Sequence, residues 1–391
     1  MSDGGFEPEP ASKVSRGKFL AAAGISVGGF ALGSPLAAAA TAATAASPLV
    51  AGKLPRKWDR ETDVVVVGSG GAALAGAIAA KASGSQVLVL ERAPLIGGTT
   101  LKSGGEYWIP NNPVMQAKGL TGPREDAIKL MLRLSYPSIY DPGSPLYGVP
   151  QRQFDLIATF YDRGAEMVSY MDKVGAFKSM VQPSLGYTAR PDLGFDPDYH
   201  ADLPENKAPY GRGLDAVGTG SGGGGNLILN MQNWVKKNGV PVVYKQRVVG
   251  VFRNSHGQVV GVQVESGGKM LAIRARKGVI FGTGGFTQDS QKALNFLRGP
   301  IFGGCGVPTN TGDFVDIGIA LGAELGNMNH AFWVQNLVEQ ALQYSSVPAE
   351  VWIPYGDSMV LVNKYGQRIT NEKMVYNERT QSHFTWAATE S

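Results

Sequence analysis

The residues best placed to do chemistry lie near position 68, where glycines are spaced to receive a phosphate. Gly68-Ser69-Gly70-Gly71-Ala72-Ala73 fits the pattern G-x-G-x-x-A. Gly68 permits a tight turn, Gly70 leaves space for a diphosphate beside the backbone, and Ala73 lets a helix pack close to a strand. The N-terminus of such a helix offers free N–H groups and the positive end of its dipole. These residues predict a dinucleotide site.

The elements around this turn must hold it in place. A β-branched run over 63–67 predicts a buried parallel strand, 72–82 predicts a helix rich in small residues, and 86–90 predicts a second strand. Glu91 follows that strand, about 20 residues after Gly68, where a carboxylate can accept hydrogen bonds from ribose hydroxyls. The glycine pattern alone is weak evidence for a nucleotide site. A strand, turn, helix, strand and acidic residue in this order favour an α/β, Rossmann-like fold.

A second glycine-rich segment over 91–105 distinguishes between dinucleotides. Two glycine pairs separated by hydroxyl residues predict another loop of close approach beyond the first turn. A dinucleotide with a bulky tricyclic ring needs such a loop, which favours FAD over NAD. The residues expected to bind the cofactor here are Gly68, Gly70, Gly71, Ala73, Glu91, Arg92, Gly98, Thr99, Thr100, Ser103, Gly104 and Gly105.

The run Ser-Gly-Gly-Glu-Tyr-Trp-Ile-Pro-Asn-Asn over 103–112 resembles the FAD-dependent fumarate reductase and 3-ketosteroid dehydrogenase superfamily, and most of all its ketosteroid dehydrogenase branch. The resemblance covers roughly 63–376. It implies non-covalent FAD in a domain over 58–335, with a parallel sheet, helices and a small antiparallel region. It also implies an inserted α+β cap domain that begins at 336.

Further motifs carry the same resemblance along the chain. A strand near Val248 is expected along the adenine, and 277–286 resembles a second glycine turn containing Gly284 and Gly285. The Asn-Thr-Gly-Asp segment over 310–313 resembles a flavin-side turn, with Gly312 and Asp313, followed by a helix to 325. Residues 360–368 predict a strand, a turn and a strand.

The resemblance assigns catalysis first to Tyr376, which occupies the position of the arginine proton donor of fumarate reductases. It implies a tyrosine base that removes a proton α to a ketone while the β-hydrogen leaves as hydride to the flavin. Because the ordinary pKa of tyrosine is about 10, the base needs help, which Arg379 could supply from the next helical turn. Alternatively, Tyr376 packs in the cap and Arg379 pairs with Glu372 or Glu378.

Tyr199 is the second catalytic candidate, because ketosteroid dehydrogenases line their cleft with a segment similar to 197–204. Tyr187 competes for that role, and simple loop packing is an equal alternative. Arg212, between two glycines, is expected to fix this loop near the flavin. We assign no chemistry to 218–225. Other fumarate-reductase features are missing, since Trp352 and Tyr355 stand where that branch has its proton-relay Glu and Arg.

Three functional hypotheses follow. The first is FAD-dependent desaturation of a ketosteroid-like or other cyclic ketone, with a small-molecule substrate and an unidentified electron acceptor. The second is a fumarate-reductase-like ene-reductase. The third is an inactive, truncated flavoprotein, because members of the family continue further and the cap is expected to be incomplete at Ser391.

Charge and the counts of cysteine and histidine bear on three classes of interaction: nucleic-acid binding, disulfide formation and metal binding. The net charge is +4 without a dense basic stripe, which argues against nucleic acid. Cys305 is the sole cysteine, so an intramolecular disulfide is impossible, and we expect a small filler residue there. The four histidines are far apart in sequence, and no metal is predicted.

The first 50 residues are typical of an export signal. Ser15-Arg16-Gly17-Lys18-Phe19-Leu20 is similar to the twin-arginine pattern, with Gly17 replacing the second arginine, and an Ala/Gly-rich stretch follows. Export to the periplasm is therefore expected. The alternatives are a membrane anchor or a disordered tail on a cytoplasmic protein. The many Ala, Gly and Ser residues argue against a firm membrane span.

Overall fold

The computed structural model describes residues 49–391, except 52, 184–191, 193, 219–222, 299–300, 302, 345, 347–358 and 387–391. The export-like segment and the residues Tyr187, Trp352 and Tyr355 lie outside the described part. Among the helices of the described part, none combines the length and the apolar character that a bilayer crossing needs.

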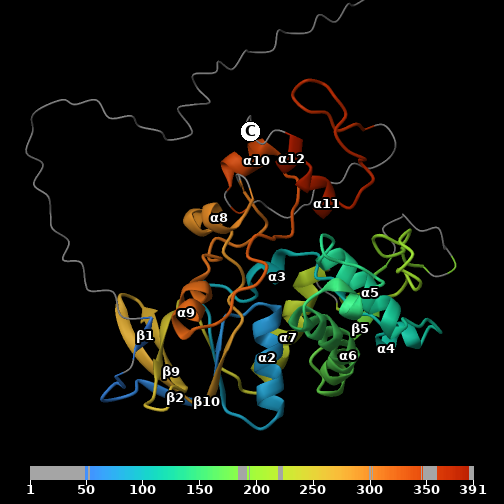
Figure 1. Ribbon diagram of the computed structural model, residues 1–391. Coiled ribbons are helices and arrows are strands. Elements are labelled where there is room, and N and C mark those ends of the chain that lie inside the picture. The colour runs from blue at the N-terminus through green and yellow to red at the C-terminus, as the bar shows by residue number, and fades with distance from the viewer. Residues whose placement is uncertain are drawn as a thin grey trace, which may run out of the picture. The chain divides into compact units, whose positions relative to one another are not determined.

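A seven-stranded sheet forms the centre of the fold (Figure 1). Its strands, in spatial order, are β1 (Val50–Ala51), β8 (Arg247–Arg253), β9 (Val259–Ser266), β10 (Lys269–Phe281), β2 (Arg60–Val67), β3 (Val87–Leu90) and β7 (Val242–Val243). Strand β2 is parallel to β10 and β3, and β3 is parallel to β7, whereas β9 runs antiparallel to β8 and β10. The predicted parallel sheet with a small antiparallel region is confirmed.

Strand β10 belongs to both parts of this sheet. Its first half pairs with β9, its second half pairs with β2, and the register shifts between Ala275 and Gly278. The strand ends at Phe281, beside the end of β2 at Val67. The two glycine turns that follow these strands therefore emerge at the same edge of the sheet.

The apolar run of β2 is continuous because both faces of the sheet are covered. Val64 and Val66 lie in a core with helices α2 (Gly71–Ala82) and α7 (Gly223–Lys237). Val65 and Val67 point to the opposite core, which includes β8, β9 and Ile317 of helix α9 (Asp313–Leu321). Figure 1 shows α9 on one side of the strands and α2 on the other.

A second, antiparallel sheet carries the loop that contains Tyr199. It consists of β4 (Tyr107–Trp108), β6 (Gly213–Ala216) and β5 (Ser179–Val181). The green helices of Figure 1 lie beside it. They are α4 (Pro113–Gln116), α5 (Arg124–Ser135) and α6 (Gln151–Lys173), and the 3-10 helix η1 (Pro145–Gly148) precedes α6.

The last part of the chain forms short helices near the C-terminal label in Figure 1. They are α10 (Val338–Gln343), α11 (Tyr376–Gln381) and α12 (His383–Trp386), while α8 (Ser290–Phe296) comes earlier in the chain. The Trp333 N–H donates to Asn377 Oδ1 at 2.9 Å, and its ring meets that of Phe384 edge to face. Contacts therefore continue across the domain boundary expected at 336.

Three boundaries differ from those predicted. The sheet begins at Val50, before the expected start at 58, because β1 pairs with β8. Helix α9 ends at Leu321 because Gly322 adopts a left-handed conformation. The predicted strands within 360–368 reduce to one bridge, Val362 to Arg368, because Asn363 Oδ1 accepts from the N–H groups of Tyr365 and Gln367 and forms a side-chain-stabilised turn.

Candidate functional site

The predicted phosphate turn requires its glycine for a packing reason as well as a conformational one. Gly68 has a φ of +97°, and a Cβ added there would lie 2.3 Å from the carbonyl oxygen of Gly282. A Cβ on Gly282 would lie 2.7 Å from that of Ala73, which is fully buried. The turn after β2, the start of α2 and the end of β10 thus meet backbone to backbone. The first turn of α2 carries no acidic side chain, so its positive end is not neutralised there.

Glu91 lies at the tip of β3, beside this turn. Its Oε2 accepts from Ser69 Oγ at 2.5 Å, and its Oε1 accepts from the N–H of Ala93 at 2.7 Å. The Gly97 N–H in turn donates to Ser69 Oγ. The carboxylate is therefore fixed in orientation, and each oxygen keeps a further lone pair that can accept from a ribose hydroxyl.

The second glycine loop is tied to the first turn by its threonines. A short helix, α3 (Gly98–Lys102), follows Gly97, whose φ is +107°. The N–H of Gly71 donates to Thr100 Oγ1 at 3.1 Å. Thr99 Oγ1 accepts from the Val307 N–H and from Asn310 Nδ2. The hydroxyl groups of both threonines thus fasten neighbouring loops to α3.

The second glycine turn and the Asn-Thr-Gly-Asp turn also contact each other. Gly284 has a φ of +72°, and a Cβ there would lie 2.8 Å from Asn310 Oδ1. The Gly312 N–H donates to the carbonyl of Gly285 at 3.1 Å. A Cβ on Gly312 would lie 2.6 Å from that of Phe286. These glycines let two turns lie against each other at the edge where β2 and β10 end.

Asp313, the first residue of α9, holds two arginines. Arg247 donates to both of its carboxylate oxygens, at 2.9 and 3.1 Å, and Arg92 Nη1 lies 3.3 Å from Oδ2. Arg92 also donates to Thr311 Oγ1 and to the carbonyl of Thr309. Burial alone would raise the pKa of Asp313, but the two guanidinium groups and Thr311 outweigh it and lower that pKa. Arg92 therefore connects the loop after β3 to the N-terminus of α9.

The first residues of α7 complete this region, although no chemistry was assigned to 218–225 from sequence. A Cβ on Gly224 would lie 1.7 Å from the carbonyl oxygen of Thr100, and one on Gly105 would lie 2.1 Å from the nitrogen of Gly224. The Gly224 N–H donates to the carbonyl of Ser103, whose Oγ accepts from the Gly105 N–H. A run of glycines at a helix start, following another glycine loop, is the signal that could have suggested such a contact.

Val248 is placed differently from the glycines. Its side chain is buried in the core of the sheet and pairs with Val264 on β9. The ladder register shifts between Val248 and Gly250. Contact with an adenine would therefore be made by the backbone near this shift rather than by the valine side chain.

These segments form a region that fits FAD. At Gly68 the backbone of the turn approaches Gly282 too closely for a side chain, and a fixed carboxylate stands beside the turn. A helix N-terminus without acidic residues suits a diphosphate, and the joined loops at 97–105, 282–286 and 310–313 continue the region beyond it.

The two predicted catalytic tyrosines lie together. The rings of Tyr199 and Tyr376 meet edge to face, with centroids 6.0 Å apart, and Phe332 meets Tyr376 in the same way at 5.2 Å. Tyr199 is 58% exposed, so the cluster has an open side. The loop between β5 and β6 and the start of α11 thus form one aromatic surface.

The environment of Tyr376 raises its pKa rather than lowering it. Burial is the largest cause, followed by Tyr199, Glu106 and Glu378. The expected helix is present, but the buried guanidinium of Arg379 donates to Gln335 Oε1 at 2.7 Å and to the carbonyl of Glu372 at 2.8 Å. The Glu372 group that accepts from Arg379 here is the backbone carbonyl, whereas the alternative paired Arg379 with the carboxylate of Glu372 or Glu378.

Arg212 fixes the loop that carries Tyr199, as its glycine-flanked position suggested. Its Nε lies 2.6 Å from Asp198 Oδ2, it donates to Asn206 Oδ1, and it stacks over the Trp108 ring at 4.9 Å. Burial raises the pKa of Asp198 to about 6, against the opposing effects of Arg212 and Trp108. Asn206 then donates to the carbonyls of Tyr199 and His200.

Glu106 is a residue of this site that the sequence did not single out. It directly follows Gly105 of the second glycine loop, and its charge acts on Tyr376. Although Glu106 is exposed, desolvation by the surrounding chain and the charges of Asp215 and Asp198 raise its pKa. An acid next to the glycine pair of a predicted cofactor loop was the available signal.

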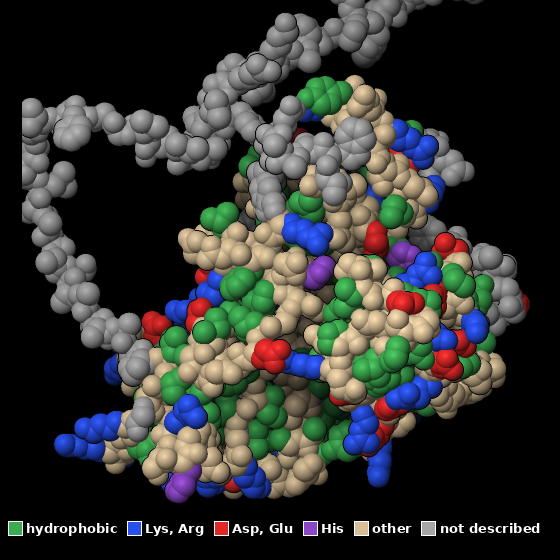
Figure 2. All heavy atoms as spheres, in the orientation of Figure 1, with side chains coloured by type: hydrophobic (Ala, Val, Ile, Leu, Met, Phe, Trp, Pro, Cys, Tyr) green, Lys and Arg blue, Asp and Glu red, His purple; other side chains and the backbone are tan. Residues whose placement is uncertain are grey.

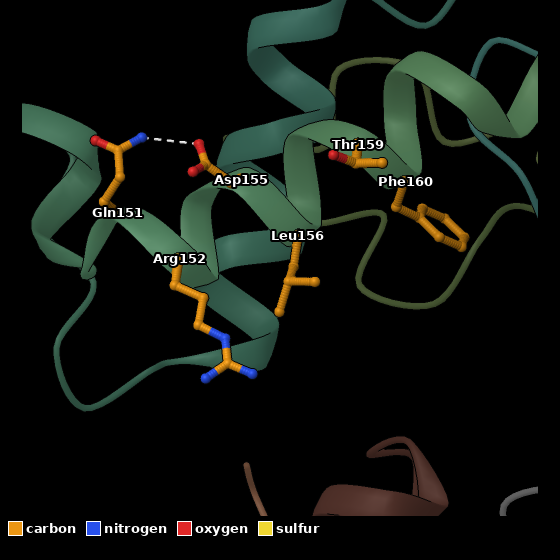
Figure 3. A pocket seen from close by; sticks show the side chains of 6 residues that line it. All are labelled: Gln151, Arg152, Asp155, Leu156, Thr159 and Phe160. Carbon is orange, nitrogen blue, oxygen red and sulfur yellow. Dashed lines mark hydrogen bonds between the residues drawn. The ribbon is translucent and has the colours of Figure 1, made fainter. Parts of the chain in front are cut away.

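A hollow elsewhere on the surface shares no residue with this site. It has a volume of about 630 Å³ and lies along α6, lined by Gln151, Arg152, Asp155, Leu156, Thr159 and Phe160 (Figure 3). Several of its polar side chains already have partners within the protein, since Gln151 donates to Asp155 at 2.7 Å and Arg152 pairs with Glu324. The convergence of residues around Tyr376, rather than this hollow, marks the candidate site.

Two further features of the described part of the chain are its surface charge and its possible metal ligands. On the face shown in Figure 2, basic and acidic side chains are interspersed. Within the described residues, no group of three His, Cys, Asp or Glu side chains is arranged to hold a metal ion.

Comparison with known proteins identifies the family. Residues 63–390 match the FAD binding domain family. The 3-oxosteroid 1-dehydrogenase of Mycolicibacterium smegmatis is 29% identical, over 82% of this chain and 63% of its own. The 4-oxocyclohexanecarboxylate 2-dehydrogenase of Sinomonas cyclohexanicum is 25% identical, over 83% of this chain and 61% of its own.

A solved structure agrees with these relatives. The 3-ketosteroid-delta4-(5alpha)-dehydrogenase of Rhodococcus jostii RHA1, in complex with 4-androstene-3,17-dione, is 27% identical with a TM-score of 0.61, over 83% of this chain and 64% of its own. This chain therefore belongs to the FAD binding domain family, and its cofactor is FAD. It spans somewhat less than two thirds of the length of these relatives.

Proposed function

We propose that this chain belongs to an FAD-dependent oxidoreductase that introduces a double bond next to the carbonyl of a ketosteroid-like or other cyclic ketone. The observation that carries the proposal is the meeting of Tyr199 and Tyr376, and the charge of Glu106, which follows the second glycine loop, acts on Tyr376. Bound FAD supplies the hydride acceptor. The tyrosines supply the apolar faces and hydroxyl groups that a ring ketone needs.

The chemistry divides between the cofactor and Tyr376. The C–H bond α to the carbonyl breaks and its proton goes to the Tyr376 oxygen, while the β-hydrogen leaves with its electron pair and a C=C bond forms. Because its surroundings raise the pKa of Tyr376, only a small fraction is phenolate near neutral pH. Tyr199 and Phe332 hold the ring of Tyr376 edge to face and so orient its hydroxyl.

The similar proteins support a ring ketone as substrate. The names of both curated relatives describe dehydrogenases of an oxo-substituted ring compound, and the similar solved structure holds a steroid dione. The exposed, aromatic surface at Tyr199 suits a flat alicyclic molecule better than a small dicarboxylate, whose charges need cationic partners.

A second candidate, reduction of an α,β-unsaturated ketone, is favoured by one observation. A tyrosine with a raised pKa stays protonated and can donate a proton to the α-carbon when hydride arrives at the β-carbon. The fumarate-like version of this reaction is less well supported, because Arg379 is buried and donates to Gln335 and to the Glu372 carbonyl.

The test is ketone oxidation by the chain reconstituted with FAD, followed by reduction of an artificial electron acceptor. We expect activity with a 3-ketosteroid or a simpler cyclic ketone, and a loss of about 100-fold or more in Tyr376→Phe. Tyr365→Phe is the matched control, since Tyr365 is an exposed tyrosine in the turn of the cap. Full activity in Tyr376→Phe would refute the role of Tyr376. Oxidation of reduced flavin by enones, with no ketone oxidation, would establish the reductive direction instead.

A further inference from the structure

Directly beside the tyrosine pair, a second pair of residues joins the same two segments. His200 follows Tyr199, and Glu378 lies on α11 two residues after Tyr376. His200 Nε2 lies 3.7 Å from Glu378 Oε2. This distance exceeds that of a hydrogen bond, so the contact is an ion pair when His200 is protonated. Both atoms are buried, and neither makes a hydrogen bond within the described residues.

The backbone of His200 is held in an unusual conformation to make this contact. Its φ is +58°, in the left-handed region that is uncommon outside glycine, although asparagine, aspartate and histidine adopt it more often than other residues. The Asn206 side chain donates to the carbonyl of His200 at 3.1 Å, and the Leu203 N–H donates to the same carbonyl. Asn206 is in turn held by buried Arg212. His200 is thus fixed from its own loop, and its ring lies beside Glu378 of α11.

We propose that His200 and Glu378 are positioning residues, whose ion pair holds the Tyr199 loop against α11 so that Tyr199 and Tyr376 keep their edge-to-face geometry. The proposal rests on the proposed function of Tyr376. It adds that the protonation state of His200 regulates the activity of Tyr376. Substrate would meet an ordered tyrosine pair only while the ion pair is formed.

The charges around His200 set the pH range of the pair. Glu378 on α11 has the largest influence and raises the pKa of His200, and Asp202 in the loop raises it further. Burial and the charge of Arg133 on α5 lower the same pKa. Because the folded pKa of His200 is raised, its stabilising contribution is complete below about pH 6.5 and is lost as the pH rises through the folded value. The Glu378 pKa is lowered against the effect of burial, mainly by His200 and Asn377. Its contribution is therefore lost only when the pH falls through that lowered value.

The first test needs neither FAD nor substrate. In a chain with ¹³C-labelled histidine, NMR titration should show a histidine signal that is absent in His200→Asn and whose pKa lies above the ordinary histidine value, and that pKa should fall in Glu378→Gln. Asparagine is the chosen replacement because it tolerates a positive φ. His256→Asn, in the exposed turn between β8 and β9, is the control. A His200 pKa that Glu378→Gln leaves unchanged would overturn the ion pair.

The second test separates positioning from stability. The ratio of kcat between wild type and His200→Asn should be on the order of tenfold near pH 6 and approach one above the pKa of His200, with KM little changed. Glu378→Gln should behave alike, and the double variant should lose no more than either single one. A ratio that does not depend on pH would refute the positioning role. Absence of any ketone oxidation in wild type would count against the proposed function, while the NMR titration would still decide whether the pair exists.

Discussion

The ring of Tyr199 stands perpendicular to that of Tyr376, at 89° between planes and 6.0 Å between centroids. Tyr199 lies in a loop that Arg212 fixes, and Tyr376 is the first residue of α11. Edge-to-face pairs of this kind contribute about 0.5–1.5 kcal/mol, and the exposure of Tyr199 places this one toward the lower end. Its importance therefore lies in orientation of the Tyr376 hydroxyl rather than in stability.

The raised pKa of Tyr376 predicts a particular pH profile. If the phenolate is the base, the rate of ketone oxidation should rise with pH by up to about tenfold per unit across the neutral range, because the fraction deprotonated grows until the pKa is reached. The measurement is kcat against pH in His200→Asn, where the second titration is removed. A plateau already at neutral pH would contradict a raised pKa.

Gly224→Ala should abolish tight FAD binding. The added Cβ would lie 1.7 Å from the Thr100 carbonyl, so the start of α7 and the second glycine loop must separate. We expect a loss of at least tenfold in affinity, measured by quenching of flavin fluorescence, together with a lower melting temperature. Gly278→Ala is the control, because its Cβ would meet no atom within 4 Å. Equal affinity in the two variants would show that the loop does not bind the cofactor.

Glu91→Gln tests the ribose contact. The replacement keeps the size of the side chain but loses the charge that accepts from Ser69 Oγ and the Ala93 N–H. Loss of a charge-assisted hydrogen bond costs about 1.5–3 kcal/mol, so FAD should bind roughly tenfold or more weakly in a direct titration. Glu61→Gln, at the exposed start of β2, should leave the affinity unchanged.

Asp313→Asn should change stability in a pH-dependent way. Because the pKa of Asp313 is lowered in the folded state, its contribution is present above the unfolded value of about 3.9 and is lost as the pH falls through the folded value. We expect the variant to be less stable than wild type by about 1–3 kcal/mol at neutral pH, because Arg92 and Arg247 lose the negative charge of their shared acceptor. Urea unfolding at several pH values would measure it.

Asp316→Asn serves as the comparison, since Asp316 lies on the same helix and pairs with Lys292 at a more exposed position. If the two aspartate variants have the same stability at every pH, Asp313 is not the anchor that its contacts indicate.

The nucleotide-binding half of the fold was predictable because its elements are continuous in sequence. The β-branched run, the glycine turn and the small-residue helix each determine their own structure, and β2, α2 and β3 lie where the pattern places them. The resemblance also selected Tyr199 and Tyr376 separately. Their contact could not be derived, because it depends on how Arg212 and Asn206 fold the loop that carries Tyr199.

The features that local patterns did not predict have physical explanations as well. Helical spacing correctly placed Arg379 one turn after Tyr376, but the guanidinium turns toward Gln335, on a segment that no local pattern connects to α11. The predicted strands near Val362 gave way to a turn because Asn363 and Glu372 take the backbone N–H groups that a ladder would use. The glycines of α7 contact Thr100 and Gly105, a relation visible only in three dimensions.

The double pairing of β10 has a consequence for unfolding. Strand β10 pairs with the antiparallel strand β9 and with the parallel strand β2. Unfolding of β10 therefore breaks the hydrogen bonds of both strands at once. Amide exchange in β9 and in β2 should therefore slow together when FAD is added, even though β9 lies on the far side of β10 from the phosphate turn.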